Sequence, residues 1–298
     1  MSITNVTVAG SGVLGYQIAF QTAFHGFKVS VYDISDEVLE KAKAKFQNLA
    51  ERYKADINAT QQQIDATLAN LSYTSDLAES VKNADLLIEA VPEIPEIKVE
   101  FYKKLADLAP EKTIFATNTS TLLPSQFAAE TGRQEKFLAL HFANEIWIRN
   151  TAEIMGHPET SAETFDAVVA FSKSIGMVAL PLHKEQPGYI TNSLIVPWVT
   201  AALKLWSGEV ADYKTIDKTW IIGTGSNFAP FVFADIAGLN TAYNITSTLA
   251  TTANDPLLHQ AAKRLKEEYI DKGKLGVATG EGFYKYPNPE YLEADFLK

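Results

Sequence analysis

The 298-residue sequence predicts an α/β fold, in which a mainly parallel sheet covered by helices on both faces precedes an all-helical domain. Up to residue 182, short β-branched runs alternate with helical segments, which is the order typical of parallel sheets. A glycine-rich turn separates the first strand from the first helix. After residue 186 the strand pattern stops and helical periodicity takes over. We therefore expect two domains, residues 1–186 and residues 187–298.

The elements expected in the first domain follow one another at regular spacing. Strands are expected at 5–10, 28–33, 85–91, 113–118, 137–143, 151–156 and 177–182, and helices at 15–26, 96–109 and 162–176. A helical pair is expected between residues 35 and 71. Ser35, followed by two acidic residues, is a good helix start, and Thr60 with Gln63 fits a capping box that opens a second helix through Leu71.

Composition excludes several classes of function. Lys and Arg number 26 against 36 Asp and Glu, so the net charge of −10 disfavours nucleic acid and anionic membranes as partners. Cysteine is absent, which excludes disulfides and thiolate metal sites and suits a reducing cytoplasm. No metal site is expected, because no two histidines have helical ligand spacing. The first residues enter a strand without a basic and apolar leader, and we expect a cytoplasmic protein without a membrane segment.

The glycine-rich turn "GSGVLG" at residues 10–15 has a specific chemical use. Gly10 allows a tight turn, Gly12 lets a pyrophosphate approach the backbone, and Gly15 lets helix and strand pack closely. Val13 and Leu14 complete the turn, and the following helix start presents unpaired N–H groups to phosphates. A lone turn of this kind is a weak signal, but its place between a strand and a helix predicts a Rossmann-type dinucleotide site.

Asp33 ends the second strand and indicates which dinucleotide binds. A carboxylate there accepts hydrogen bonds from both hydroxyls of the adenine ribose and repels a 2′-phosphate. The residues that follow, "ISDE", supply no arginine for such a phosphate. We therefore expect NAD, rather than NADP, as the cofactor.

His141 interrupts an apolar run and is the candidate acid–base group. By itself it is most simply a packed core residue. Glu153 follows twelve residues later, a reasonable separation if the two lie on adjacent strands joined by a loop. Oxidation of a secondary alcohol needs removal of its O–H proton, and imidazole, with an ordinary pKa of about 6.5, suits that transfer. A carboxylate on the other ring nitrogen would fix the tautomer.

Further motifs line up along the whole chain in one order. They are "EAVPE" with Lys98, "TIFATNTSTL", "HFAN" followed by Glu153, "PGYITN", "FAPFVFADIAGLN" and "GEGFYKY". Together they resemble the L-3-hydroxyacyl-CoA dehydrogenase family. The resemblance implies an NAD-binding domain with a helical hairpin inserted after its second strand, followed by a helical domain that forms a homodimer interface.

The resemblance also implies roles for single residues. His141 is expected to be the catalytic base and Glu153 its orienting partner. Ser120 and Asn192 are expected to hold the substrate oxygen, although Ser120 could instead be a turn residue and Asn192 a helix N-cap. The remaining matches are Asn144 beside the substrate and Glu93, Lys98 and Asn118 along the cofactor.

The chain departs from the family between His141 and Glu153. The family's loop is rich in proline, whereas this one reads "EIWIRNT", with Trp147 and Arg149. A guanidinium can hold a carboxylate through two hydrogen bonds, so Arg149 is a further candidate for substrate binding. Arg52 and Lys54 could contact the phosphates of coenzyme A.

These observations predict a small-molecule enzyme that interconverts an L-3-hydroxyacyl-CoA and the 3-ketoacyl-CoA with NAD. Two alternatives remain open. The first is a dehydrogenase of a free hydroxy acid, similar to carnitine or gulonate dehydrogenases, that uses the same histidine and glutamate. The second is an NAD-binding structural protein without turnover.

Overall fold

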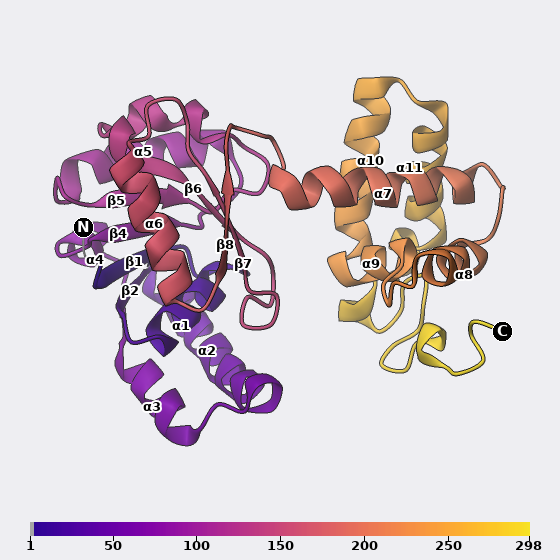
Figure 1. The fold of residues 1–298 in the computed structure, drawn as a ribbon, viewed down its shortest axis with the longest axis horizontal. Helices are drawn as coiled ribbons and strands as arrows, with labels where there is room; N and C mark the ends of the chain where they lie inside the picture. The colour runs from indigo at the N-terminus through magenta and orange to yellow at the C-terminus, as the bar shows by residue number, and fades with distance from the viewer. Residues whose placement is uncertain (1–2) are drawn as a thin grey trace. The chain divides into compact units, whose positions relative to one another are not determined.

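A computed structural model describes residues 3–298 of the chain, which form two compact units. The first unit ends at Ile190 and the second spans Thr191–Lys298. Figure 1 colours the first from indigo to rose and the second from salmon to yellow.

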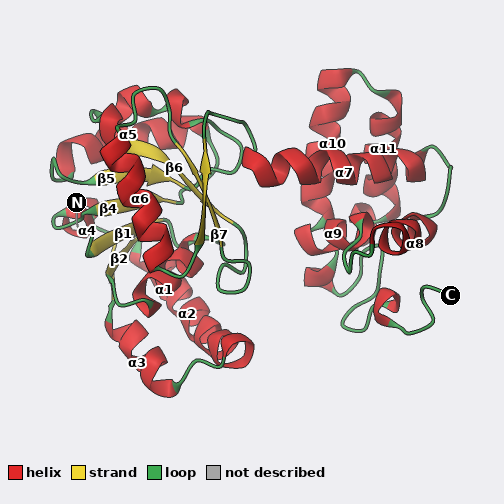
Figure 2. Cartoon of the chain, in the orientation of Figure 1, coloured by secondary structure: helices red, strands yellow, loops and turns green. Residues whose placement is uncertain are grey.

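The first unit is built on a sheet of eight strands within residues 3–298, in the order β3-β2-β1-β4-β5-β6-β7-β8. Figure 2 shows these strands in yellow, among helices in red. Neighbouring strands are parallel except for β6 and β7, which are antiparallel. The strands are β1 (Asn5–Ala9), β2 (Lys28–Tyr32), β3 (Leu71–Thr74), β4 (Leu86–Glu89), β5 (Ile114–Thr117), β6 (Phe137–Phe142), β7 (Thr151–Met155) and β8 (Val178–Leu182).

Helices cover both faces of this sheet, as the predicted α/β class requires. They are α1 (Gly15–Phe24), α2 (Asp36–Ile57), α3 (Gln61–Ala69), α4 (Leu77–Val81), α5 (Pro95–Leu108) and α6 (Ala162–Ser174), with three 3₁₀ turns, Pro124–Gln126, Ala128–Thr131 and Gln134–Lys136. Leu86 and Ile88 of β4 pack in one apolar cluster, while Leu87 packs in another. Successive strand residues point to opposite faces, so these two clusters are the two buried faces of the sheet.

The helical pair predicted between β2 and β4 is present as α2 and α3, which extend away from the sheet in Figure 1. The Ser35 hydroxyl accepts a hydrogen bond from the Val38 amide, and Thr60 with Gln63 forms the predicted capping box. The predicted end at Leu71 was wrong, because α3 stops at Ala69 and Leu71 begins β3. This edge strand has only four residues, and its burial does not alternate, so its pattern gives no strand signal.

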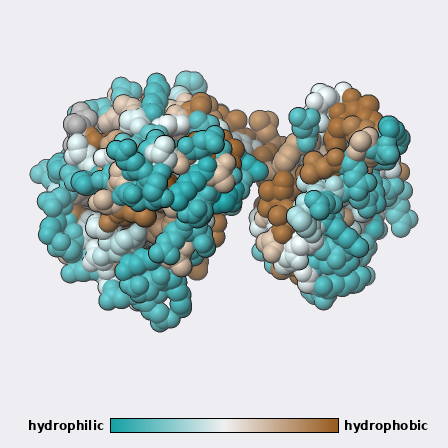
Figure 3. All heavy atoms as spheres, turned by 90° about the horizontal axis from the view of Figure 1, so that it is seen from below, coloured by the Kyte–Doolittle hydropathy of each residue, from teal (hydrophilic) through white to brown (hydrophobic). Residues whose placement is uncertain are grey.

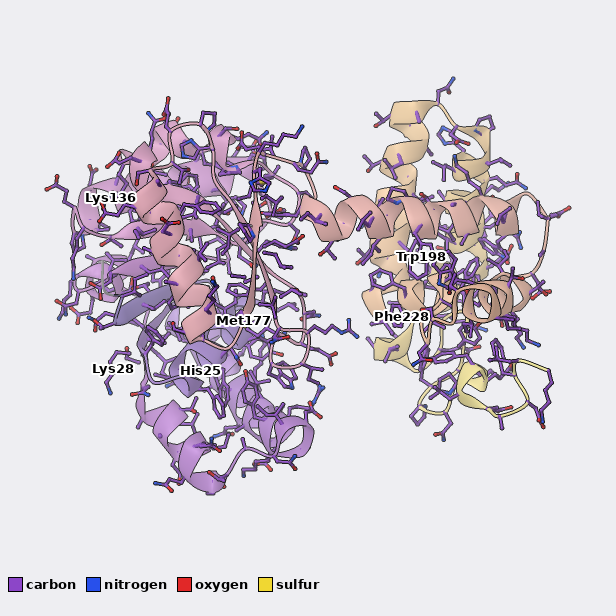
Figure 4. All side chains as sticks on the ribbon, in the orientation of Figure 1. His25, Lys28, Lys136, Met177, Trp198 and Phe228 are labelled. Atoms are coloured by element: carbon purple, nitrogen blue, oxygen red, sulfur yellow. The ribbon has the colours of Figure 1, made fainter. Side chains whose placement is uncertain are left out.

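The described residues of the second unit form helices and irregular segments, with isolated β-bridges at Gly276–Glu281 and Glu281–Lys285 but no strand. Helix α7 (Tyr189–Ser207) leads into it, followed by α8 (Tyr213–Thr224), α9 (Pro230–Ala237), α10 (Leu239–Ala253) and α11 (Pro256–Glu268), and by 3₁₀ turns at Ile270–Lys272, Val277–Thr279 and Glu290–Leu292. Trp198 and Phe228, labelled in Figure 4, both contact Phe233 in its aromatic core. No helix of residues 3–298 is long and apolar enough to cross a membrane.

A buried carboxylate explains the "GEGFYKY" motif in this unit. Asp235 is 1% exposed and accepts hydrogen bonds from the amides of Phe283 and Tyr284, each at 2.8 Å. A Cβ atom on Gly282 would overlap the Asp235 carboxylate, and one on Gly276 would overlap its carbonyl. The two glycines are therefore needed for the C-terminal segment to pack on α9.

Candidate active site

The glycine turn joins β1 to α1, and its three glycines differ in their surroundings. Gly10 has φ of +101°, and a Cβ atom there would overlap the carbonyl oxygen of Ala90. A Cβ atom on Gly15 would overlap the carbonyl of Gly10, whereas one on Gly12 would meet no atom within 4 Å. Packing therefore requires the outer two glycines, and the middle one leaves open space beside the backbone. An open backbone at a helix N-terminus fits a pyrophosphate group.

Asp33 follows β2 directly and faces this turn. Its Oδ2 atom accepts hydrogen bonds from the Ser11 amide at 2.7 Å and the Ser11 hydroxyl at 2.5 Å, and its Oδ1 accepts from the Ile34 amide at 2.8 Å. A carboxylate has about four acceptor positions, so further hydrogen bonds from a ribose can be accommodated. Val13, at the tip of the turn, is 65% exposed. The arrangement fits the dinucleotide expected from the sequence.

His141 on β6 lies directly opposite Glu153 on β7, which confirms the prediction that the two residues occupy adjacent strands. His141 Nδ1 lies 3.0 Å from Glu153 Oε2, and the two residues are 8% and 2% exposed. Because a carboxylate only accepts, the hydrogen belongs on Nδ1. The other carboxylate oxygen of Glu153 accepts a hydrogen bond from the Ile190 amide at 3.0 Å. This leaves Nε2 as the ring nitrogen for proton exchange.

Tyr189 completes the surroundings of His141 and was not among the residues predicted from the sequence. Its ring stacks on the imidazole, with ring centroids 4.4 Å apart and planes inclined by 13°. Its hydroxyl donates a hydrogen bond to the carbonyl oxygen of Thr119 at 2.8 Å. Tyr189 is fully buried and has φ of +55°, unusual for a residue with a side chain. Its place in the "PGYITN" motif was the only available signal.

Ser120 lies in a turn that follows β5 and is held by the carboxylate of Glu93. Glu93 Oε1 accepts hydrogen bonds from the Ser120 amide at 2.9 Å and from the Thr121 amide and hydroxyl at 3.1 and 3.0 Å. The Thr119 hydroxyl donates to the same oxygen at 2.5 Å. Ser120 itself is exposed. One carboxylate thus fixes the backbone of residues 119–121 and leaves the Ser120 side chain at the surface of the turn.

Lys98 connects Glu93 to a fully buried carboxylate beneath it. Lys98 Nζ lies 2.7 Å from Glu89 Oε1 and 3.2 Å from Glu93 Oε2, and the side chains of Lys98 and Glu89 are 1% and 0% exposed. Tyr102 and Thr117 donate hydrogen bonds to Glu89 Oε2. The charge of Lys98 is therefore already bound by two carboxylates, so an approach to the cofactor by Lys98 stays a prediction.

The pKa of Glu93 reflects this network. Burial favours the neutral acid, but the hydrogen bond from Thr119, the charge of Lys98 and the hydrogen bond from Thr121 outweigh it and hold the pKa below the usual range. Glu93 is therefore ionised at neutral pH and acts as an acceptor for the turn.

Three predicted amide residues lie in different places. Asn118 Oδ1 accepts a hydrogen bond from the Phe142 amide at 3.0 Å, next to His141. Asn144 Oδ1 accepts from Gln17 of α1 at 2.7 Å. Asn192 belongs to α7 in the second unit. Because α7 begins at Tyr189, the interpretation of Asn192 as an N-cap was wrong, and its role in substrate binding stays a prediction.

The loop between β6 and β7 is attached to α2 by charged and aromatic contacts. Glu145 Oε1 lies 3.0 Å from an Arg52 nitrogen, and its other oxygen lies 3.6 Å from Arg149. Asp56 accepts hydrogen bonds from Arg52 at 2.9 Å and from Trp147 at 3.0 Å. Arg149 remains 42% exposed. Both arginines proposed for anionic groups therefore already have a carboxylate partner.

Lys54, the other cation predicted to face a phosphate, lies 2.8 Å from Glu51 on the same helix. The α2 surface thus carries its own balancing acids. Within residues 3–298, no group of three or more histidine, aspartate or glutamate side chains is arranged to hold a metal ion.

Comparison with family models covers nearly the whole chain. Residues 5–186 match the NAD-binding domain of 3-hydroxyacyl-CoA dehydrogenase, and residues 188–286 match the C-terminal domain of the same enzyme. The chain is 33% identical over 289 residues to the mitochondrial hydroxyacyl-coenzyme A dehydrogenase of Homo sapiens, covering 95% of this chain and 91% of the relative.

Two solved structures are similar along the same length. An (S)-3-hydroxybutyryl-CoA dehydrogenase from Ralstonia eutropha is 30% identical, with a TM-score of 0.84, and the match covers 96% of this chain and all of that one. A diketoreductase described as acting on dicarbonyl compounds is 54% identical, with a TM-score of 0.92 and the same coverage.

Proposed function

The chain belongs to the 3-hydroxyacyl-CoA dehydrogenase family, and we propose that His141 and Glu153 are the acid–base pair with which it interconverts an L-3-hydroxyacyl-CoA and the 3-ketoacyl-CoA. The observation that carries this proposal is the buried 3.0 Å contact between His141 Nδ1 and Glu153 Oε2 across β6 and β7. Such a contact holds one ring nitrogen and leaves the other for the substrate.

The chain's own groups divide the work of the reaction. His141 Nε2 removes the hydroxyl proton in oxidation and returns it in reduction, while Glu153 holds the ring and stabilises its cation. Ser120, on the turn fixed by Glu93, donates a hydrogen bond to the substrate oxygen. This hydrogen bond stabilises the substrate most strongly in the transition state, when negative charge develops on the oxygen. Burial of the His141–Glu153 pair excludes water and strengthens these contacts.

NAD is the cofactor of the family's N-terminal domain. When bound, it supplies the carbon-to-carbon hydride transfer that side chains cannot carry out. The open backbone at Gly12 would accept its pyrophosphate, and Asp33 the hydroxyls of its adenine ribose. In our proposal, Glu93 and Asn118 lie along the bound cofactor between Asp33 and His141.

A second candidate substrate is a small dicarbonyl compound without coenzyme A. The 54% identity to a diketoreductase favours it. The β6–β7 loop favours it too, because Arg149 in that loop and Arg52 on α2 both face the carboxylate of Glu145. The reaction at the carbonyl carbon would be the same, and only the group attached to it would differ.

Homodimer formation and a cytoplasmic setting are further parts of this proposal. Large apolar side chains of the second unit are exposed, among them Leu194 (68%), Val210 (71%) and Ile222 (63%). Figure 3 shows brown apolar atoms gathered on parts of this unit's surface. Exposed apolar area of this kind marks interaction surfaces. The absence of cysteine suits a reducing compartment.

If the apolar surface of the second unit joins two copies, light scattering at micromolar concentration will give about twice the 32.7 kDa chain mass. Leu194→Asp should then shift the mass toward that of one chain, because a charge on a buried apolar surface is costly. A single-chain mass for the unsubstituted protein would contradict the dimer.

His141→Ala should lower kcat about 10²–10⁴-fold, as expected for loss of a general base. The dissociation constant of NADH, measured by fluorescence, should change little because in our proposal His141 acts on the substrate hydroxyl and the glycine turn holds the cofactor. His259→Ala, which removes an exposed histidine from α11, serves as the control and should keep full activity. Near-normal turnover of the His141 variant would remove the acid–base assignment.

NADH oxidation with acetoacetyl-CoA and with ethyl acetoacetate tests whether the substrate carries coenzyme A. The two compounds have the same 3-keto group. If coenzyme A is bound, kcat/KM for the thioester should exceed that for the ester by more than about tenfold, or ~1.4 kcal/mol of extra binding. A preference for the ester would select the dicarbonyl candidate. Tight NADH binding without turnover of either compound would contradict both candidates.

A further inference from the structure

Two groups, Glu93 and Tyr189, contact the Ser120 turn, and one of them also contacts the His141 ring. Glu93 accepts hydrogen bonds from residues 119–121, and Tyr189 donates one to the Thr119 carbonyl while stacking on the imidazole. We propose that Tyr189 is a positioning residue, which fixes the orientation of His141 and sets its distance from Ser120. This inference rests on the proposed acid–base role of His141.

The stacked ring limits how the imidazole can turn. The hydrogen bond that His141 Nδ1 donates to Glu153 holds one ring atom but still permits the ring to tilt about that contact. Tyr189 lies nearly parallel to the imidazole, with centroids 4.4 Å apart, and covers one face of it. A tilt would push the two rings together. The direction of Nε2, which exchanges the proton, is therefore set by Tyr189 as well as by Glu153.

The backbone beside Tyr189 reinforces this arrangement. The next residue, Ile190, donates its amide hydrogen to Glu153 Oε1 at 3.0 Å. One dipeptide thus contacts both members of the pair, the ring of His141 through a side chain and the carboxylate of Glu153 through an amide. Tyr189 adopts φ of +55° in this segment, a left-handed conformation that is unfavourable for a residue with a side chain.

The tyrosine hydroxyl then links this frame to the turn. It donates to the carbonyl oxygen of Thr119 at 2.8 Å, one residue before Ser120. Burial, together with the nearby charges of Glu93, Glu153 and Glu89, raises the pKa of Tyr189, so the hydroxyl keeps its proton and remains a donor. Phenylalanine at this position would supply the stack without the link.

Glu93 is the second group that holds the Ser120 turn. Its carboxylate binds the amides of Ser120 and Thr121, and Lys98 ties that carboxylate to the buried Glu89. The turn is therefore held by the Glu89–Lys98–Glu93 ion network and by Tyr189, whose ring stacks on His141. Ser120 and His141 must both reach one substrate oxygen, so an error of about 1 Å in their separation can cost a factor of about 100 in rate.

The test compares Tyr189→Phe and Tyr189→Leu with the unsubstituted enzyme, and uses Tyr73→Phe on β3 as a control tyrosine. We expect Tyr189→Phe to lower kcat about 3- to 10-fold, the effect of losing one buried hydrogen bond. Tyr189→Leu, which also removes the stack, should lower kcat further and change the pH profile of kcat. NADH affinity should stay within about twofold in all variants, and Tyr73→Phe should keep full kcat.

Two results would overturn the inference. One is a kcat within twofold of normal in both Tyr189 variants. The other is a loss of kcat matched by an equal loss of NADH affinity and a lower unfolding midpoint, which a purely structural role would produce. If Tyr189→Leu does not fold, Tyr189→Phe alone decides between these outcomes. The His141→Ala enzyme distinguishes failure of the proposed function from failure of the Tyr189 inference. Normal turnover in that enzyme would contradict the acid–base role of His141, whatever the Tyr189 variants show.

Discussion

The antiparallel pairing of β6 with β7 is the constraint on which the site depends. Every other neighbouring pair in the sheet is parallel, and a parallel connection would carry the chain through a crossover helix before returning. The reversal lets a short loop bring Glu153 directly opposite His141 in the strand register. Side chains alternate between faces, so a slip of one residue would move the carboxylate to the other face of the sheet. Such a slip would also take the buried carboxylate away from its hydrogen-bond partner His141, which opposes it.

Support for this pair comes from two networks of different physical character. The Glu89–Lys98–Glu93 network is electrostatic. Its Glu89–Lys98 pair is almost fully buried, whereas Glu93 is 38% exposed, and loss of either buried partner typically leaves an uncompensated charge that costs about 3–5 kcal/mol. Through Glu93, this network fixes the turn at residues 119–121. Tyr189 contributes a stacked ring and one hydrogen bond, and connects that turn to His141. The glycine turn belongs to the same edge of the sheet, since Asp33 and residues 118–121 follow the carboxyl ends of β2 and β5.

Local patterns in the sequence predicted the parts of the fold and site that have local causes. The glycine turn, the Ser35 cap and the Thr60–Gln63 box each depend on residues within a few positions, and the His141–Glu153 spacing needed only the assumption of neighbouring strands. Features that depend on distant contacts were not predicted. The partners of Lys98 lie on β4 and in the loop before α5, a buried lysine has no distinct local pattern, and Tyr189 meets residues far along the chain. The contacts of the β6–β7 loop with α2, such as Arg52 with Glu145, are equally remote in sequence.

In our proposal the reaction type rests on the His141–Glu153 pair, which is buried, and the choice of substrate rests on the β6–β7 loop, which is partly exposed and balanced in charge. The most direct measurement of the central claim is the pH dependence of kcat for alcohol oxidation in Glu153→Gln. An amide keeps the shape of the side chain but carries no charge to stabilise the imidazolium that forms during proton transfer, so kcat should fall and its pH profile should change. An unchanged kcat and an unchanged profile would show that Glu153 only packs against His141, and would contradict the account.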